Sequence, residues 1–236
     1  MLKSDSPALA LSPLTSRTLG DHVTAQIREA ILTGRLKPGQ RIVEREIAEA
    51  MQTSRGPVRD ALKALENERL VARYPHKGTF VVWLNRRDLE EVYSLREAIE
   101  SLAVDYVIRD ATPEQIDTLD RLVEAMAVQA RRDYTQFEAT EIDLEFHHTL
   151  CQISGHRRLL RAWEALNPQI RMLVLQHRTL LPEDFRQTGV EWHRQIVDAL
   201  RQRDGTVALD LLRKHLAASF QSVARLFGET AEPAPA

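Results

Sequence analysis

Apolar positions in the front third of the chain follow a helical period. They recur every four residues from Val23 to Ile31, which predicts a helix that ends before Gly34. A second, shorter helix is predicted at residues 44–51. A third is predicted directly after Ser54, because serine is a favoured N-cap residue. The first region therefore begins with three helices joined by short turns.

Two strands follow the third helix. Residues 70–74 (LVARY) and 79–83 (TFVVW) are rich in residues that favour strands and flank the tight turn PHKG, so they predict a β-hairpin. Two helices joined by a short turn and followed by a hairpin form the outline of a winged helix-turn-helix. In that motif the N-terminal residues of the second helix enter the major groove of DNA.

Basic residues form a stripe along one face of the third predicted helix. Arg55, Arg59 and Lys63 lie at i, i+4 and i+8, and Lys77 lies in the hairpin turn. Seen alone, such a stripe is more typical of a solvated helix face. The neighbouring helices and hairpin favour a DNA-binding role for this stripe instead. We therefore expect Arg55 and Arg59 to contact bases or phosphates. Lys77 could reach the backbone or the minor groove.

The rest of the chain has helical periodicity, with short connections between capped segments. The predicted fold is mainly α, a winged helix-turn-helix followed by an all-helical antiparallel bundle. The bundle helices are predicted at residues 88–109, 113–132, 135–154, 157–180, 184–203 and 204–228. The predicted organisation is a flexible segment (1–16), a DNA-binding domain (17–83), a linker (84–87), a helical domain (88–228) and a flexible tail (229–236).

Composition narrows the class of protein. The 236 residues carry a formal net charge of −2, but residues 1–83 hold 13 Lys and Arg against 9 Asp and Glu. This imbalance agrees with DNA binding without identifying it. The sequence offers neither an apolar run of about 18 residues nor a signal peptide, and a single cysteine, Cys151, cannot form an internal disulfide. We therefore expect a cytoplasmic protein that does not bind membranes.

Polar residues interrupt the apolar faces of the bundle. Asp143 and His147, at i and i+4, project from one helix face, whereas His148 is turned about 100° away and is left out. His193 and His215 lie at or beside apolar faces of later helices. Three imidazoles and a carboxylate suit Zn or Ni, and also Mn or Fe. From spacing alone, however, a histidine near an apolar face is more often an ordinary core residue than a metal ligand.

The front region resembles the DNA-binding domain of the GntR family of bacterial transcription regulators. The segments "GRLKPG", "SRGPVRDAL" and "KGTFV" carry the resemblance over residues 17–83, with Gly56 where many members have threonine. The resemblance implies a homodimer that binds double-stranded operator DNA with an inverted repeat. The residues that it implies in DNA contact are Arg45, Ser54, Arg55, Arg59, Lys77 and Gly78.

Residues 88–227 resemble the FCD domain, the helical effector domain of the FadR subgroup of this family. The segments "DLEEVYSLREAIESLAV", "DLEFHHTLCQISGHRRLL", "EWHRQIVDAL" and "ALDLLRKHL" carry the resemblance. Many members hold a metal with one Asp and three His. The residues that match here are Asp143, His147, His193 and His215, whereas His156 stands where asparagine is usual.

These observations predict a transcription regulator, more specifically a repressor, controlled by a small carboxylate effector bound beside a divalent metal. Arg96 is the first candidate to pair the carboxylate and Arg171 the second. Arg96 could instead form an i, i+4 salt bridge with Glu100. A metal-dependent enzyme and a purely structural metal are the alternatives. We do not expect an enzyme, because the sequence offers no evident nucleophile and base pair beside the ligands.

Overall fold

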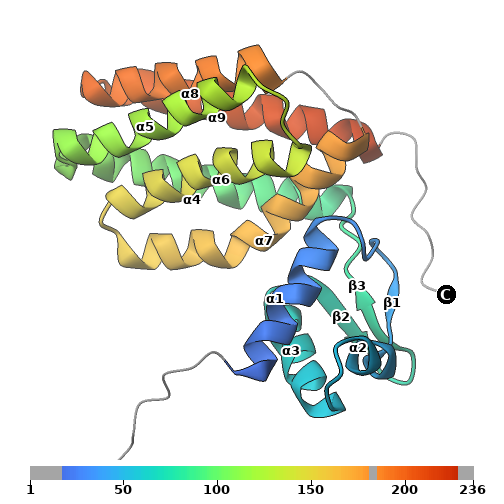
Figure 1. Cartoon of the computed structure of the whole chain (residues 1–236). Helices are drawn as coiled ribbons and strands as arrows, with labels where there is room; N and C mark the ends of the chain where they lie inside the picture. The colour runs from blue at the N-terminus through green and yellow to red at the C-terminus, as the bar shows by residue number, and fades with distance from the viewer. Residues whose placement is uncertain (1–17, 181–184, 228–236) are drawn as a thin grey trace, which may run out of the picture.

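The computed structural model describes residues 18–180 and 185–227, and the chain is mainly helical, as predicted. Figure 1 shows a small N-terminal unit and a larger layer of long helices. The N-terminal unit consists of α1 (Leu19–Leu32), β1 (Arg41–Ile42), α2 (Glu44–Ala50), α3 (Arg55–Asn67), β2 (Val71–Tyr74) and β3 (Gly78–Val81). Its helices and hairpin confirm the predicted winged helix-turn-helix.

The sheet of this unit has one strand more than the sequence predicted. Strand β3 lies in the centre and pairs antiparallel with both β2 and β1. The extra strand β1 has two residues, with Arg41 opposite Phe80. Its pattern is too short to show a period of two, and its partner is distant in the sequence, so pattern reasoning missed it.

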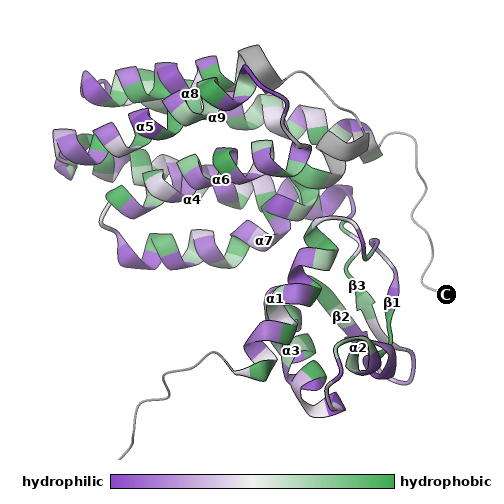
Figure 2. Ribbon diagram, in the orientation of Figure 1, coloured by the Kyte–Doolittle hydropathy of each residue, from purple (hydrophilic) through white to green (hydrophobic). Residues whose placement is uncertain are grey.

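In the part of the chain that the structure describes, the second unit contains six long helices and a short 3₁₀ helix. They are α4 (Arg86–Asp110), α5 (Pro113–Ala130), α6 (Gln136–Ile153), α7 (Arg157–Leu180), α8 (Phe185–Arg201), α9 (Gly205–Ala224) and η1 (Arg225–Phe227). Helix α4 packs against α6, α7 and α9, whereas α5 packs against α6 and α8. Figure 2 shows hydrophobic and hydrophilic residues alternating around these helices, as amphipathic packing requires. No helix in the described ranges is long and apolar enough to cross a membrane.

The start of α4 differs from the predicted one. The sequence placed the start of this helix at Asp88, with an acidic residue at its cap, and residues 84–87 in a linker, but the helix begins at Arg86 with Asn85 as its N-cap. The Asn85 side chain accepts from the Asp88 amide, and the Asp88 carboxylate accepts from the Asn85 amide. This capping box places the acidic residue three positions inside the helix. Two residues of the proposed linker therefore belong to α4.

Two polar side chains fix helix ends in the bundle. His156 stands directly before α7, and its Nδ1 accepts a hydrogen bond of 3.1 Å from the Leu159 amide. The imidazole thus supplies a hydrogen-bond acceptor at the start of α7, as an asparagine at this position can. Arg203, in the turn between α8 and α9, donates to the carbonyls of Val107, Ile108 and Ala111 at the end of α4. The Val107 carbonyl also accepts from the Ala111 amide, whereas the carbonyls of Ile108 and Ala111 lie at the helix end, where the helix supplies no amide partner.

Candidate functional site

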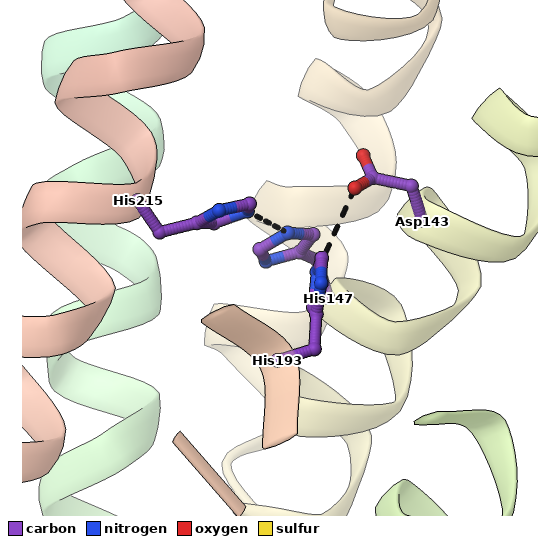
Figure 3. A group of neighbouring side chains, drawn as sticks. All are labelled: Asp143, His147, His193 and His215. Carbon is purple, nitrogen blue, oxygen red and sulfur yellow. Dashed lines mark hydrogen bonds and ion pairs between the residues drawn. The ribbon is translucent and has the colours of Figure 1, made fainter. Parts of the chain in front are cut away.

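The four predicted metal ligands come together in the core of the bundle. Asp143 and His147 extend from α6, His193 from α8 and His215 from α9. All four are buried, and the atoms that could bind a metal lie within 4.8 Å of one another. Figure 3 shows the three imidazoles and the carboxylate converging on one point. The structure therefore brings together the four residues named as metal ligands, in a cluster that could bind a metal.

Hydrogen bonds hold two of the imidazoles with Nε2 facing the cluster. Nδ1 of His147 lies 2.7 Å from Oε2 of Glu100, and Nδ1 of His193 lies 2.6 Å from the carbonyl oxygen of Gly189. A carbonyl oxygen can only accept a hydrogen bond, so Nδ1 of His193 carries the proton. The ionised carboxylate of Glu100 can also only accept, so the proton of His147 is placed on its Nδ1 as well. Nε2 of His147 lies 3.2 Å from Nε2 of His215.

Burial favours the neutral form of two imidazoles in the cluster. Burial lowers the pKa of His193 to about 4 and the pKa of His215 well below its ordinary value, so both rings are neutral near pH 7. Nε2 of His193 lies 3.6 Å from Oδ1 of Asp143 and has no hydrogen-bond partner among the described residues. Three ring nitrogens and one carboxylate oxygen fit a borderline divalent metal.

A buried ion pair lies beside the cluster. Nε of Arg96 donates to Oε1 of Glu100 over 2.7 Å, which is the salt bridge considered from the sequence. Nε1 of Trp163 donates to the same oxygen over 3.0 Å. Burial would raise the pKa of Glu100, but the charge of Arg96 and the contacts with His147 outweigh burial and hold it below its usual range. Nη2 of Arg96 is buried and unpartnered among the described residues.

Sequence reasoning missed the contacts of Glu100 with His147 and Trp163. The available signal was the position of Glu100, one turn after Arg96 on the same face of α4. The indole that meets it comes from α7, more than 60 residues later in the chain. Only the packing of α4 against α6 and α7 brings these groups together.

Arg171 does not join the cluster. It pairs with Glu141, which lies two residues before Asp143 and therefore on another side of α6. Its neighbours line a small surface pocket that also includes His148, whose Nε2 lies 3.5 Å from Glu164. The exclusion of His148 from the ligand set agrees with this position.

The predicted DNA-contacting side chains lie around α2, α3 and the hairpin turn. Arg45, Arg55 and Arg59 are exposed, and Arg59 forms an ion pair of 2.8 Å with Glu44. Ser54 is the N-cap residue of α3, as predicted, but its hydroxyl makes no capping hydrogen bond. An exposed hydroxyl at this position is available to a phosphate oxygen.

The hairpin turn brings a further arginine to this surface. Lys77 is exposed in the turn between β2 and β3, and Gly78 has φ of +110°, a conformation that favours glycine. A Cβ on Gly78 would lie 3.2 Å from Nε of Arg41. Arg41 therefore lies against the turn. Sequence patterns did not single it out, because strand β1, which positions it, was not predicted.

A winged helix-turn-helix joined to a helical bundle defines a class of DNA-binding proteins. Two family models match the chain, "Bacterial regulatory proteins, gntR family" over residues 19–81 and "FCD domain" over residues 91–218. The chain belongs to the GntR family of transcription regulators and carries an FCD domain.

Relatives and solved structures agree with this assignment. An HTH-type transcriptional regulator in an unstable DNA locus of Streptomyces ambofaciens is 31% identical over 94% of this chain and 92% of that protein. The gluconate operon transcriptional repressor of Bacillus licheniformis is 27% identical over 89% of this chain and 85% of its own. The structure of E. coli McbR/YncC is similar in fold, with a TM-score of 0.71, 20% identity and coverage of 90% of this chain and 100% of that one.

Proposed function

We propose that this regulator is a repressor whose affinity for operator DNA is controlled by a small organic acid bound beside a divalent metal in the bundle. One observation carries the proposal: two buried polar atoms at the cluster, Nη2 of Arg96 and Nε2 of His193, lack hydrogen-bond partners among the described residues. Leaving such an atom unpaired costs about 1–3 kcal/mol. A bound acid and a bound cation would each satisfy one of them.

The metal would be held by Asp143, His147, His193 and His215, with Zn or Ni favoured and Mn or Fe also suited. When bound, it would supply open coordination positions for the oxygen atoms of the effector. Arg96 would pair the carboxylate, because its charge already acts on Asp143 and on the rings of His193 and His215. Arg171 is the weaker candidate, since Glu141 already pairs with it.

Hydroxy acids are the first effectors to consider. One relative is named for the gluconate operon, and gluconate carries both a carboxylate and neighbouring hydroxyl groups. A carboxylate would suit Arg96, whereas a hydroxyl would suit an open metal position. Sugar acids therefore come before dicarboxylates and amino acids in a ligand screen.

DNA binding is assigned to the winged helix-turn-helix of a homodimer acting on an inverted repeat in the cytoplasm. The family assignment supports DNA as the partner. The proposed contact residues are Arg45, Ser54, Arg55, Arg59, Lys77 and Gly78. A two-fold dimer presents two recognition helices in symmetric positions and so matches a palindromic operator.

Effector binding has to favour one arrangement of the DNA-binding units over another, because a ligand shifts an equilibrium only through differential affinity. Helix α7 packs against α1 of the DNA-binding unit and also carries Trp163 at the Arg96–Glu100 pair. It is therefore the element that we expect to transmit the change.

A thermal-shift and gel-shift experiment tests the proposal. Sugar acids, hydroxy acids, dicarboxylates and amino acids are screened with and without a chelator. We expect at least one acid to raise the melting temperature in a chelator-sensitive manner and to change operator affinity. His193→Ala should abolish that response and keep DNA binding. Loss of thermal stability alone would indicate a purely structural metal, and a screen without a chelator-sensitive acid would contradict the effector model.

A further inference from the structure

Glu100 stands where three elements meet in the core. Its side chain is fully buried on α4. Oε2 is 2.7 Å from Nδ1 of His147 on α6. Oε1 accepts from Nε of Arg96 on α4 and from Nε1 of Trp163 on α7. One carboxylate therefore contacts a metal ligand, the candidate effector arginine and the helix that packs against the DNA-binding unit.

We propose that Glu100 is a positioning residue that fixes the proton of His147 on Nδ1, so that Nε2 points its lone pair into the cluster, while the same carboxylate holds Arg96 beside it. This inference rests on the proposed metal and effector site. It adds the group that orients that site. A carboxylate on the outer nitrogen of a ligand imidazole sets both the tautomer and the direction of the ring.

An ordinary core salt bridge does not account for the arrangement. Arg96 uses Nε on Oε1 only, and the second oxygen of Glu100 is directed at His147. The imidazole of His193 is held differently, since its Nδ1 meets the main-chain carbonyl of Gly189. His147 is thus a ligand whose orientation depends on a side chain, and a substitution can remove that control.

Glutamine at this position has the same shape but the wrong hydrogen-bond pattern. Its amide has one acceptor oxygen and one donor nitrogen, whereas all three neighbours of Glu100 donate. With its oxygen at Arg96 and Trp163, the amide turns its nitrogen towards Nδ1 of His147, which can accept only if the His147 proton moves to Nε2; with the amide reversed, its nitrogen faces two donors that cannot accept. In Glu100→Gln we therefore expect the proton of His147 to be no longer fixed on Nδ1 and Arg96 to lose its charged partner.

The experiment measures metal affinity by competition with a chelator, using Zn²⁺ and Ni²⁺ on the full-length protein. We expect Glu100→Gln to weaken binding by about 10-fold to 100-fold. Trp163→Phe is the matched control, because it removes another hydrogen bond from the same carboxylate and leaves the bond to His147. It should lower the melting temperature but change metal affinity by less than about threefold.

Nitrogen NMR of histidine-labelled protein provides a readout that general destabilisation does not imitate. In the Zn²⁺-loaded wild type, His147 should carry its proton on Nδ1. If Glu100→Gln does not fold because Arg96 is left unpaired, the double variant Arg96→Met, Glu100→Gln removes that charge. It should show the same loss of metal affinity.

The outcomes separate this inference from the proposed function. A wild type that binds neither metal overturns both. A wild type that binds metal, with Glu100→Gln equal to it or Trp163→Phe equally weakened, overturns the role of Glu100 alone. A proton on Nε2 of His147 in the Zn²⁺-loaded wild type does the same.

Discussion

Nε of Arg59 on α3 donates a hydrogen bond of 2.8 Å to Oε2 of Glu44, the first residue of α2. The pair joins the two helices of the helix-turn-helix and engages a donor that we propose for operator contact. Operator binding would exchange this carboxylate for a base edge or a phosphate oxygen, both of which suit a guanidinium.

Replacement of the recognition arginine tests this surface. Arg59→Ala should weaken operator binding by about 10-fold to 100-fold, because it removes a contact near the start of the recognition helix. A gel-shift titration at fixed salt measures the change. Lys63→Ala, one turn further along α3, should have a smaller effect. Unchanged affinity in Arg59→Ala would show that α3 does not read the operator through this residue.

Removal of the competing carboxylate should have the opposite effect. Glu44→Gln frees Arg59 and takes a negative charge away from the DNA-facing side, so operator affinity should rise by a few-fold at low salt. Stability should hardly change, because an exposed ion pair contributes little. Weaker binding would mean that Glu44 is needed to aim Arg59.

Neighbouring histidines on α6 provide a test of metal binding. Zn²⁺ or Ni²⁺ at 100 times its dissociation constant should stabilise the wild type by about 2.7 kcal/mol. His147→Ala should abolish this metal-dependent rise in melting temperature. His148→Ala should retain it, since His148 faces Glu164 rather than the cluster. Equal behaviour of the two variants in a thermal-shift assay would refute the ligand assignment.

The arginine between α8 and α9 should contribute to stability. Arg203→Met leaves the Ile108 and Ala111 carbonyls at the end of α4 without their side-chain donor, and we expect a loss of about 1–2 kcal/mol in the free energy of unfolding. Arg201→Met is the control, because that residue makes exposed ion pairs with Asp117 and Asp120 and should cost less than about 1 kcal/mol. Urea unfolding followed by circular dichroism distinguishes them.

The single thiol should be inert in the folded protein. Cys151 has no exposed surface, and burial raises the pKa of its thiol far above the usual value. Ellman's reagent should therefore react with it only as fast as the protein unfolds, and promptly in denaturant. A fast reaction in native buffer would indicate that α6 opens locally.

Local signals were sufficient for most elements. The spacing of Asp143 and His147 on one face follows from helix geometry, but spacing alone favoured an ordinary core role for the histidines, and the family resemblance joined Asp143, His147, His193 and His215 into one proposed ligand set. Contacts between distant segments were not accessible in this way. Strand β1 pairs with β3 across the whole helix-turn-helix, and Trp163 reaches Glu100 only after α4 and α7 pack. The start of α4 was misplaced because an acidic residue fits both the cap and the third position of a helix.

His156 differs in residue type from the asparagine that is usual at its position, but it supplies the same kind of hydrogen-bond acceptor. A comparison that scores residue types penalises histidine where asparagine is usual, yet the Leu159 amide finds its acceptor at 3.1 Å. The ring also stacks edge-on against Tyr106, which an asparagine could not do. A search for distant relatives of this bundle should therefore accept any side chain that offers a hydrogen-bond acceptor directly before α7. Such a search would retain members that a fixed asparagine motif discards.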